Sequence, residues 1–510
     1  MLFSSYEFIL FFLPVTLIVY YWLGFKRQFR VAIAWLVASS LFFYGWWNPA
    51  YLGLMVASIL FNYSMGVALS GEARSKALLV AGIAANLGLL GYFKYTNFMI
   101  DNLNLLFDTR VYVQDIILPL AISFFTFQQI AYLVDAYRGE TREYNFMQYT
   151  LFVTFFPQLI AGPIVHHREM LPQFSRHITE QINPTNLMAG SVMFFIGLFK
   201  KVMVADLLAQ YATPVFAAVE HGAKPTLLEA WGAALAYSLQ LYYDFSGYAD
   251  MAIGIALMFG ILLPLNFNSP YKSTSIIDFW RRWHMTLSRF LRDYLYIPLG
   301  GNRKGPFRRY INLAVTMVLG GLWHGAGWTF VIWGSLHGLY LVINHLWRSV
   351  CSAVGLGGGR STFPGRLLAG SITFVAVVVA WVFFRAESFD GAMAVLNGML
   401  GHYGVVLPIK YEARWGEFAT QLQGMGVVFD DNLFQGNKQL MQTLLWLLVA
   451  WLLPNSQTLM RHYKVTVDKL TDTSRIAFTP NIGWLVFVYL IAVVSILNLG
   501  GVSEFLYFQF

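Results

Sequence analysis

Long apolar runs, each close to the length that crosses a bilayer, recur along the whole chain. A transmembrane helix needs about 20 mainly apolar residues. The runs occupy residues 8–25, 31–47, 51–69, 76–93, 116–137, 146–164, 187–208, 228–262, 311–347, 367–384, 440–453 and 484–499. Two of them, 228–262 and 311–347, are too long for one crossing. We therefore expect an all-α, polytopic membrane protein, one domain over residues 1–510, with roughly eleven to thirteen membrane segments.

The composition supports this class and argues against several others. Only 12% of the residues are charged, whereas an ordinary soluble protein has about 25%. The net charge of +8 comes from short basic clusters between apolar runs, so nucleic-acid binding is not expected. Cys351 is the single cysteine, which excludes disulfides, zinc fingers and iron–sulfur clusters built from this chain's cysteines. The histidine spacings match no metal-ligand motif, so we expect no metal site.

The charges that flank the runs predict the orientation. Cytoplasmic loops are enriched in Lys and Arg. Glu7 precedes the first run and a basic cluster follows it, so this run is expected to be a retained span with the N-terminus outside. The connection 461–475 is basic, which places it in the cytoplasm and the C-terminus outside. The connection 402–438 carries more acidic than basic side chains, as expected of an outside loop.

Two carboxylates interrupt the apolar run 228–262. Asp244 and Asp250 are six residues apart, so on one continuous helix they point in substantially different directions. A paired acid and base would need a helix break at Gly247. We favour hydrogen bonds to neighbouring helices over chemistry for both residues, although an ionisable group inside a bilayer always raises a functional hypothesis.

The strongest basic patch is the segment 272–309, with nine Lys and Arg residues against Asp278 and Asp293. Aromatic and aliphatic residues recur among these charges every three or four residues, which predicts an amphipathic helix at the cytoplasmic interface. One interpretation is a helix held on anionic lipid. The other is a cytoplasmic mouth that gathers an anionic donor, because guanidinium groups suit phosphates.

A histidine surrounded by glycines lies deep in the apolar run 311–347. His324 follows Gly320 and Gly321 and would sit near the middle of the bilayer if the helix began near Ile311. A neutral imidazole in a dry site is a good general base for a hydroxyl. Basic residues at both ends of this run suggest a hairpin that could bring His337 close to His324. His284, on the basic segment, could reach the same cavity.

Three motifs together resemble the membrane-bound O-acyltransferases, in particular the branch concerned with bacterial alginate O-acetylation. They are DFWRRWH at residues 278–284, LRDYLYIPLGGNR at residues 291–303 and GGLWHG at residues 320–325. The resemblance implies a helical shell around a transmembrane tunnel with an acyl thioester donor entering from the cytoplasm. It implies that His324 is the catalytic base and that His337 is a second catalytic histidine. We further expect substrate contacts from His284, Arg281, Arg282, Arg289, Arg292, Asn302 and Trp323.

The aromatic tail at residues 504–510 resembles the tails of cell-envelope acylation systems, which implies that Tyr507 receives the acyl group. An aromatic tail that simply settles at the membrane interface is the alternative. The implied donor is acetyl-CoA, with no bound cofactor. The implied partners are an extracytoplasmic acetyltransferase with a serine nucleophile and a polysaccharide acceptor of alginate type, at a bacterial inner membrane.

Two other functions stay open. D-alanyl transfer to teichoic acids, or acetyl transfer to peptidoglycan, would use the same fold with a different donor or acceptor. A secondary transporter or flippase is the rival from another class, motivated by the intramembrane Asp244, Asp250, Lys200 and Lys201. Such carriers usually show repeat symmetry and paired broken helices, which the sequence does not display.

Overall fold

The computed structural model describes residues 1–71, 74–113, 116–140, 145–174, 182–355, 362–469 and 474–500. These residues are mostly helical, with one pair of parallel strands, β1 (Val405–Pro408) and β2 (Val427–Asp430). They form two compact units. Within the described residues, unit 1 comprises Met1–Phe199, Ser246–Asn266 and residues 456–500, and unit 2 comprises Lys200–Phe245 and Phe267–Asn455.

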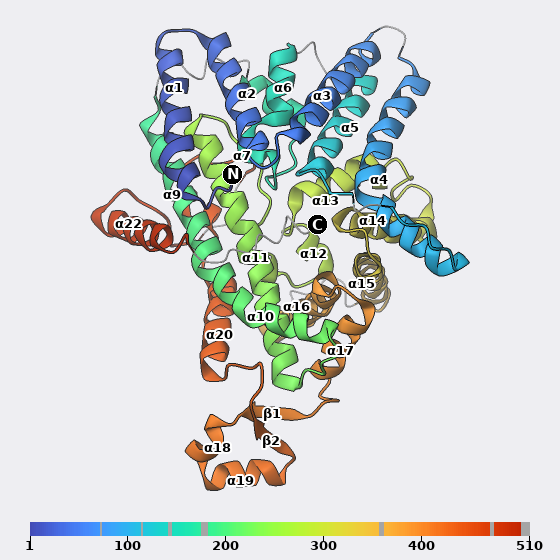
Figure 1. Cartoon of the computed structure of the whole chain (residues 1–510), viewed down its shortest axis with the longest axis vertical. Helices are drawn as coiled ribbons and strands as arrows, with labels where there is room; N and C mark the ends of the chain where they lie inside the picture. The colour runs from blue at the N-terminus through green and yellow to red at the C-terminus, as the bar shows by residue number, and fades with distance from the viewer. Residues whose placement is uncertain are drawn as a thin grey trace. The chain divides into compact units, whose positions relative to one another are not determined.

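Unit 1 is built from helices that pack as neighbours along the chain and from one distant partner. The pairs α1 with α2, α3 with α5, α4 with α5, and α9 with α22 are in contact (Figure 1). The elements are η1 (Glu7–Phe12), α1 (Leu13–Phe25), α2 (Phe29–Gly45), α3 (Ala50–Leu69), α4 (Lys76–Phe107), α5 (Ile122–Arg138), α6 (Phe146–Thr154), α7 (Phe156–Leu159), α8 (His167–Phe174), α9 (Pro184–Phe199), α21 (Ser456–Leu459) and α22 (Ile482–Leu497).

Unit 2 contains the remaining helices, and α11 (Leu227–Met258) contributes residues to both units. Its elements are η3 (Lys200–Ala205), α10 (Asp206–Glu220), η4 (Pro270–Lys272), α12 (Ile276–Trp280), α13 (Met285–Leu291), η5 (Arg292–Tyr296), α14 (Gly305–His324), α15 (Trp328–Ala353), α16 (Phe363–Arg385), α17 (Phe389–Met399), α18 (Lys410–Trp415), α19 (Glu417–Gly424) and α20 (Asn437–Leu452). The predicted outside connection 402–438 folds as a small lobe, in which α18 and α19 pack on the two strands around Tyr411 and Phe429.

The helices bear out the predicted class of protein. Within the described residues, four helices are long and apolar enough to cross a membrane, namely Glu7–Phe25, Ala50–Leu69, Lys76–Phe107 and Phe363–Arg385. Phe11, Ile18 and Trp22 on the first of these point outward and are more than half exposed, as lipid-facing side chains would be. The chain is therefore a helical membrane protein. The number of membrane segments and the single-domain boundary stay predictions.

Two expectations about individual segments were wrong. The run 228–262 is one continuous helix, α11, rather than two crossings. The basic segment 272–309 is not one amphipathic helix. It is divided into η4, α12, α13, η5 and the start of α14, and the backbone at His284, directly before α13, adopts a left-handed conformation with φ 42°. Its aromatic residues Trp280, Trp283 and Phe290 are buried instead of facing lipid.

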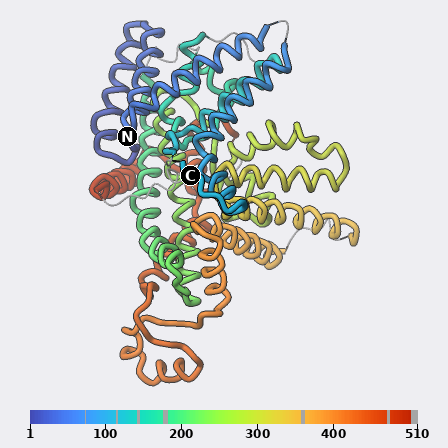
Figure 2. The backbone as a smooth tube through the Cα atoms, turned by 45° about the vertical axis from the view of Figure 1, so that its right-hand side comes forward, coloured from blue at the N-terminus to red at the C-terminus, as the bar shows by residue number. Residues whose placement is uncertain are grey.

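The predicted hairpin over residues 311–347 is present. α14 and α15 run antiparallel, side by side (Figure 2). Glycines set the close approach, because a Cβ atom on Gly321 would strike the carbonyl oxygen of Phe330 and one on Gly334 would strike that of Met317. On Gly338 a Cβ atom would lie 3.2 Å from Cα of Ala314. Helix backbones approach this closely only where small residues line the contact.

Gly334→Ala is expected to destabilise the protein by about 1–3 kcal/mol, because the added methyl group meets rigid backbone rather than a movable side chain. The measurement is the thermal unfolding temperature in detergent, which should be lower for Gly334→Ala than for wild type. Gly88→Ala on α4 is the matched control, since nothing lies within 4 Å of the position of its Cβ atom. Equal unfolding temperatures for the two variants would contradict the role assigned to Gly334.

Candidate functional site

His324 is the last residue of α14, and the chain turns directly after it. Gly325 and Gly327 are extended, and α15 starts at Trp328. A Cβ atom on Gly325 would overlap the ring of Phe330, so glycine is required beside the histidine. The sequence places a helix end here because four glycines interrupt the helical pattern within eight residues, at 320, 321, 325 and 327. His324 is 94% buried by this arrangement, with 6% of its surface exposed.

Aromatic rings surround the His324 imidazole. Its ring centroid lies 4.9 Å from Trp323, 5.1 Å from Trp333 and 5.2 Å from Phe384. Trp333 comes from α15 and Phe384 from α16, so three helices build this wall. The imidazole is thus enclosed by aromatic side chains from α14, α15 and α16.

His337 lies on the same wall, and Trp333 is the link between the two histidines. The centroids of Trp333 and His337 are 4.8 Å apart, since the two residues are four apart on α15 and share one helix face. Trp280 of α12 donates a hydrogen bond from its Nε1 to Nδ1 of His337, at 3.3 Å. The hairpin therefore places both His324 and His337 against the ring of Trp333.

His284, from the segment before α13, also lies close to His324. It precedes α13, is fully buried, and its ring centroid lies 6.2 Å from that of His324 and 4.8 Å from Phe245. Its positive φ costs free energy, on the order of 1–3 kcal/mol, and such conformations gather at functional sites. His284 lies outside the helices that qualify as membrane spans, and burial lowers its pKa to about 3. The imidazole is therefore neutral at physiological pH.

The predicted substrate-binding residues separate into two groups. Trp323 is buried and contacts His284, with centroids 6.1 Å apart, so it belongs to the histidine cluster. The others lie on the basic segment outside that cluster. Arg281, Arg292 and Asn302 are exposed, while Arg282 and Arg289 are half-buried.

Acidic or polar neighbours already hold three of these side chains. Arg282 pairs with Asp278 at 3.0 Å, and Arg292 pairs with Asp293 at 2.7 Å. The hydroxyl of Tyr296 donates to Asn302 at 2.5 Å. A phosphate group that binds Arg282 or Arg292 would have to share the guanidinium group with Asp278 or Asp293, or displace that carboxylate.

Asp244 belongs to a buried ion cluster rather than to an acid–base pair. Nζ of Lys201 lies 2.8 Å from carboxylate oxygens of both Asp244 and Asp206. Lys201 sits on η3, a π-helical turn, a feature that is frequent where a helix must place an unusual side chain. Attraction to the two carboxylates compensates for the cost of burying the ammonium group.

Asp250 has a different set of partners, in unit 1. It accepts hydrogen bonds from the Ser456 hydroxyl at 2.5 Å and from the Gln457 amide at 2.8 Å. The two carboxylates of α11 thus hold separate neighbours, as the six-residue spacing on a continuous helix predicts. These contacts support the structural interpretation of both residues.

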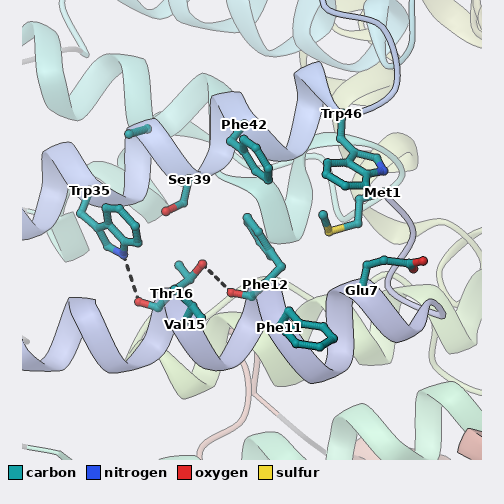
Figure 3. A pocket seen from close by; sticks show the side chains of 11 residues that line it. Met1, Glu7, Phe11, Phe12, Val15, Thr16, Trp35, Ser39, Phe42 and Trp46 are labelled. Carbon is teal, nitrogen blue, oxygen red and sulfur yellow. Dashed lines mark hydrogen bonds between the residues drawn. The ribbon is translucent and has the colours of Figure 1, made fainter.

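Unit 1 also holds an apolar cavity between α1 and α2, with a volume of about 670 Å³ (Figure 3). Phe11, Phe12, Phe42 and Trp46 are among its lining residues, and the indole of Trp35 donates to the carbonyl oxygen of Thr16 at 3.1 Å. Apart from Glu7, its lining side chains offer no charge. None of the histidines His284, His324 and His337 lines this cavity.

Two remaining predictions concern a metal and the tail. Within the described ranges, no group of three His, Cys, Asp or Glu side chains is placed to hold a metal ion. Tyr507 and the rest of the aromatic tail lie outside the described residues.

Sequence reasoning gave no role to Trp333 or to Phe384, which complete the wall around His324. The spacing of Trp333 and His337 was a usable signal, because residues four apart share a helix face. No sequence signal links Phe384, on α16, to His324. The pairing of Lys201 with Asp244 was missed for the same reason, since 43 residues separate them.

Comparisons with known proteins cover most of the chain. The model of the membrane-bound O-acyltransferase family matches residues 8–361. A peptidoglycan O-acetyltransferase of Helicobacter pylori is 41% identical over 100% of this chain and 98% of its own length. A probable alginate O-acetylase of Pseudomonas aeruginosa is 43% identical over 78% of this chain and 75% of its own. A teichoic acid D-alanyltransferase of Bacillus subtilis is 31% identical over 44% of this chain and 58% of its own.

Proposed function

The chain belongs to the membrane-bound O-acyltransferase family and is an acyltransferase, and we propose that it moves an acetyl group from cytoplasmic acetyl-CoA to an extracytoplasmic polysaccharide. The observation that carries the proposal is the buried histidine cluster. His324 and His284 lie with ring centroids 6.2 Å apart inside an aromatic wall. A neutral imidazole there can take a proton from a hydroxyl without competition from water.

The proposed reaction follows from acyl-transfer chemistry. An acceptor hydroxyl attacks the thioester carbonyl carbon while His324 takes the hydroxyl proton. The carbonyl electron pair moves to oxygen, and the tetrahedral intermediate then collapses with loss of the thiol, which recovers the proton. Arg281 and Arg289 are proposed to hold the phosphates of the donor, because guanidinium groups bind phosphate well.

The route across the membrane is a further part of the proposal. Acetyl-CoA reaches the site from the cytoplasmic face, and both termini face the outside of a bacterial inner membrane, as the loop charges favour. Tyr507 is the proposed first acceptor. An extracytoplasmic transferase with a serine nucleophile then receives the acetyl group and passes it to the polysaccharide.

The identity of the acceptor has two candidates. An alginate-type polysaccharide is supported by relatives at 43% identity over 78% of the chain. Peptidoglycan is supported by a relative that covers 100% of the chain, including the part beyond residue 361. We favour peptidoglycan on that full coverage. We expect that peptidoglycan purified from a host that lacks the gene has lost its O-acetyl groups. The acetylation of secreted polysaccharide should be unaltered.

Single-turnover transfer from radiolabelled acetyl-CoA to the purified full chain tests the reaction class. Release of CoA with retention of the label is expected. A transporter would release no CoA, and a D-alanyltransferase would not use acetyl-CoA. If membranes that contain all host partners also fail to support CoA release, the proposed donor is wrong.

Tyr507→Phe is expected to abolish retention of the label, by at least about 100-fold, because the variant lacks the hydroxyl that would carry the acetyl ester. Slow CoA release by hydrolysis should persist. Tyr489→Phe is the control, since Tyr489 is exposed on α22, 66% of its surface being accessible. Retained label in Tyr507→Phe, at normal expression, would exclude the relay.

A further inference from the structure

The hydrogen bond between Trp280 and His337 determines which nitrogen of His337 carries a proton. Nε1 of the Trp280 indole lies 3.3 Å from Nδ1 of His337, and both residues are buried. An indole nitrogen can only donate. Nδ1 of His337 is therefore the acceptor and holds no proton, and the neutral ring carries its proton on Nε2.

The resulting Nε2–H group is buried and makes no hydrogen bond to any described residue. His337 has no exposed surface at all. Phe279 stacks on its ring with centroids 6.1 Å apart, and Trp280 and Trp333 flank it. Buried donors are normally satisfied, so an unsatisfied one at a candidate site points to a ligand atom that accepts from it.

The wall between the two histidines offers a second donor of the same kind. Nε1 of Trp333 is buried and has no hydrogen-bond partner in the described part of the chain. Trp333 contacts both His324, at 5.1 Å between centroids, and His337, at 4.8 Å. N–H donors beside a general base can stabilise, by hydrogen bonds, an oxygen that gains negative charge during the reaction.

We infer that His337 donates a hydrogen bond from Nε2 to the acyl oxygen of the tetrahedral intermediate, and that Trp280 is a positioning residue that fixes the tautomer needed for this bond. The inference rests on the proposed acyl transfer. His337 transfers no proton in this scheme. The new bond joins the acceptor oxygen to the carbonyl carbon, the carbonyl electron pair moves to the oxygen that His337 contacts, and the C–S bond breaks when that pair returns.

Two amide replacements of His337 test which nitrogen matters. The glutamine amide reaches the position of Nε2, whereas the shorter asparagine amide reaches only that of Nδ1. His337→Gln is expected to keep kcat within about 10-fold of wild type, and His337→Asn to lose about 100- to 1,000-fold, the loss typical of a missing oxyanion donor. KM for acetyl-CoA should stay within about twofold in both, because the contact forms only in the transition state. Equal losses would overturn the inference.

A second variant isolates the role of Trp280. Trp280→Phe keeps an aromatic ring but removes the donor, so His337 can place its proton on either nitrogen and kcat should fall about 3- to 10-fold at constant KM. In the double variant Trp280→Phe/His337→Gln, residue 337 has no imidazole and therefore no tautomer to fix. Its kcat should therefore equal that of His337→Gln alone. If Trp280 were only structural, Trp280→Phe would lower kcat by the same factor in wild type and in His337→Gln. That result would overturn the assignment.

The control is Trp283→Phe, which makes the same change in a buried indole three residues away. The ring of Trp283 contacts those of Trp381 and Phe279 rather than a histidine ring. The kcat of Trp283→Phe is expected to stay within about twofold of wild type. Failure of the proposed function is a separate outcome, because wild type would then release no CoA from acetyl-CoA. Elution from gel filtration in detergent, compared with wild type, identifies any variant that fails to fold.

Discussion

Replacing His324 by alanine lowers kcat for acetyl transfer by about 100- to 10,000-fold, which is the usual contribution of a general base. The expected loss is large because His324 is buried in an aromatic wall, where no solvent base can replace it. Removal of an imidazole that contacts Trp323, Trp333 and Phe384 also leaves a cavity, so folding must be checked beside activity. CoA release from acetyl-CoA, followed with a thiol reagent, is the measurement.

The matched control for this variant is His402→Ala. His402 is exposed and its ring contacts Asn397, away from the histidine cluster. Its substitution should leave CoA release unchanged. Should His324→Ala fold normally and release CoA at the wild-type rate, the base would have to be another residue, and His284 would be the first candidate by distance.

Replacing Lys201 by methionine is expected to destabilise the protein by about 3–5 kcal/mol, because it leaves the Asp244 carboxylate buried without the cation that faces it. Asp206 is partly exposed, so water can solvate that carboxylate. A lower thermal unfolding temperature of the full chain in detergent is the measurement.

The double variant Lys201→Met/Asp244→Asn provides the control. Removing the orphaned charge should restore much of the lost stability, since replacing a whole buried ion pair costs far less than breaking it. A proton-carrying Lys201, as a transporter would require, predicts the reverse pattern. In that case Lys201→Met would abolish activity while the unfolding temperature stayed near that of wild type.

Local features of the sequence predicted most of the helices. The run 8–25 became η1 and α1, the run 51–69 became α3, and the run 367–384 became α16, with ends within a few residues. Apolar runs of this length allow few other structures, because the backbone must satisfy its own hydrogen bonds in lipid. The motif around His324 could also be found, since glycines beside a histidine mark a close approach.

The structure of the segment 272–309 could not be predicted from its local sequence pattern. Its periodicity resembles an amphipathic helix, yet tertiary contacts bury Trp280 and Trp283 and bend the chain at His284. Helix propensity is a weak preference that packing readily overrides. The same bend places His284 next to His324, so the departure from the predicted helix is part of the candidate site.

The sequence by itself determined the class of protein, the positions of most of its helices, the family resemblance and the histidine at the centre of the site, because these depend on apolar run length and on short motifs. Only the tertiary structure decided that Trp333 contacts both His324 and His337, that Trp280 fixes the proton of His337, and that Lys201 neutralises Asp244. Apart from the contact between Trp333 and His337 within α15, these contacts join side chains from separate helices, and their distances depend on how the helices pack, which no local pattern encodes.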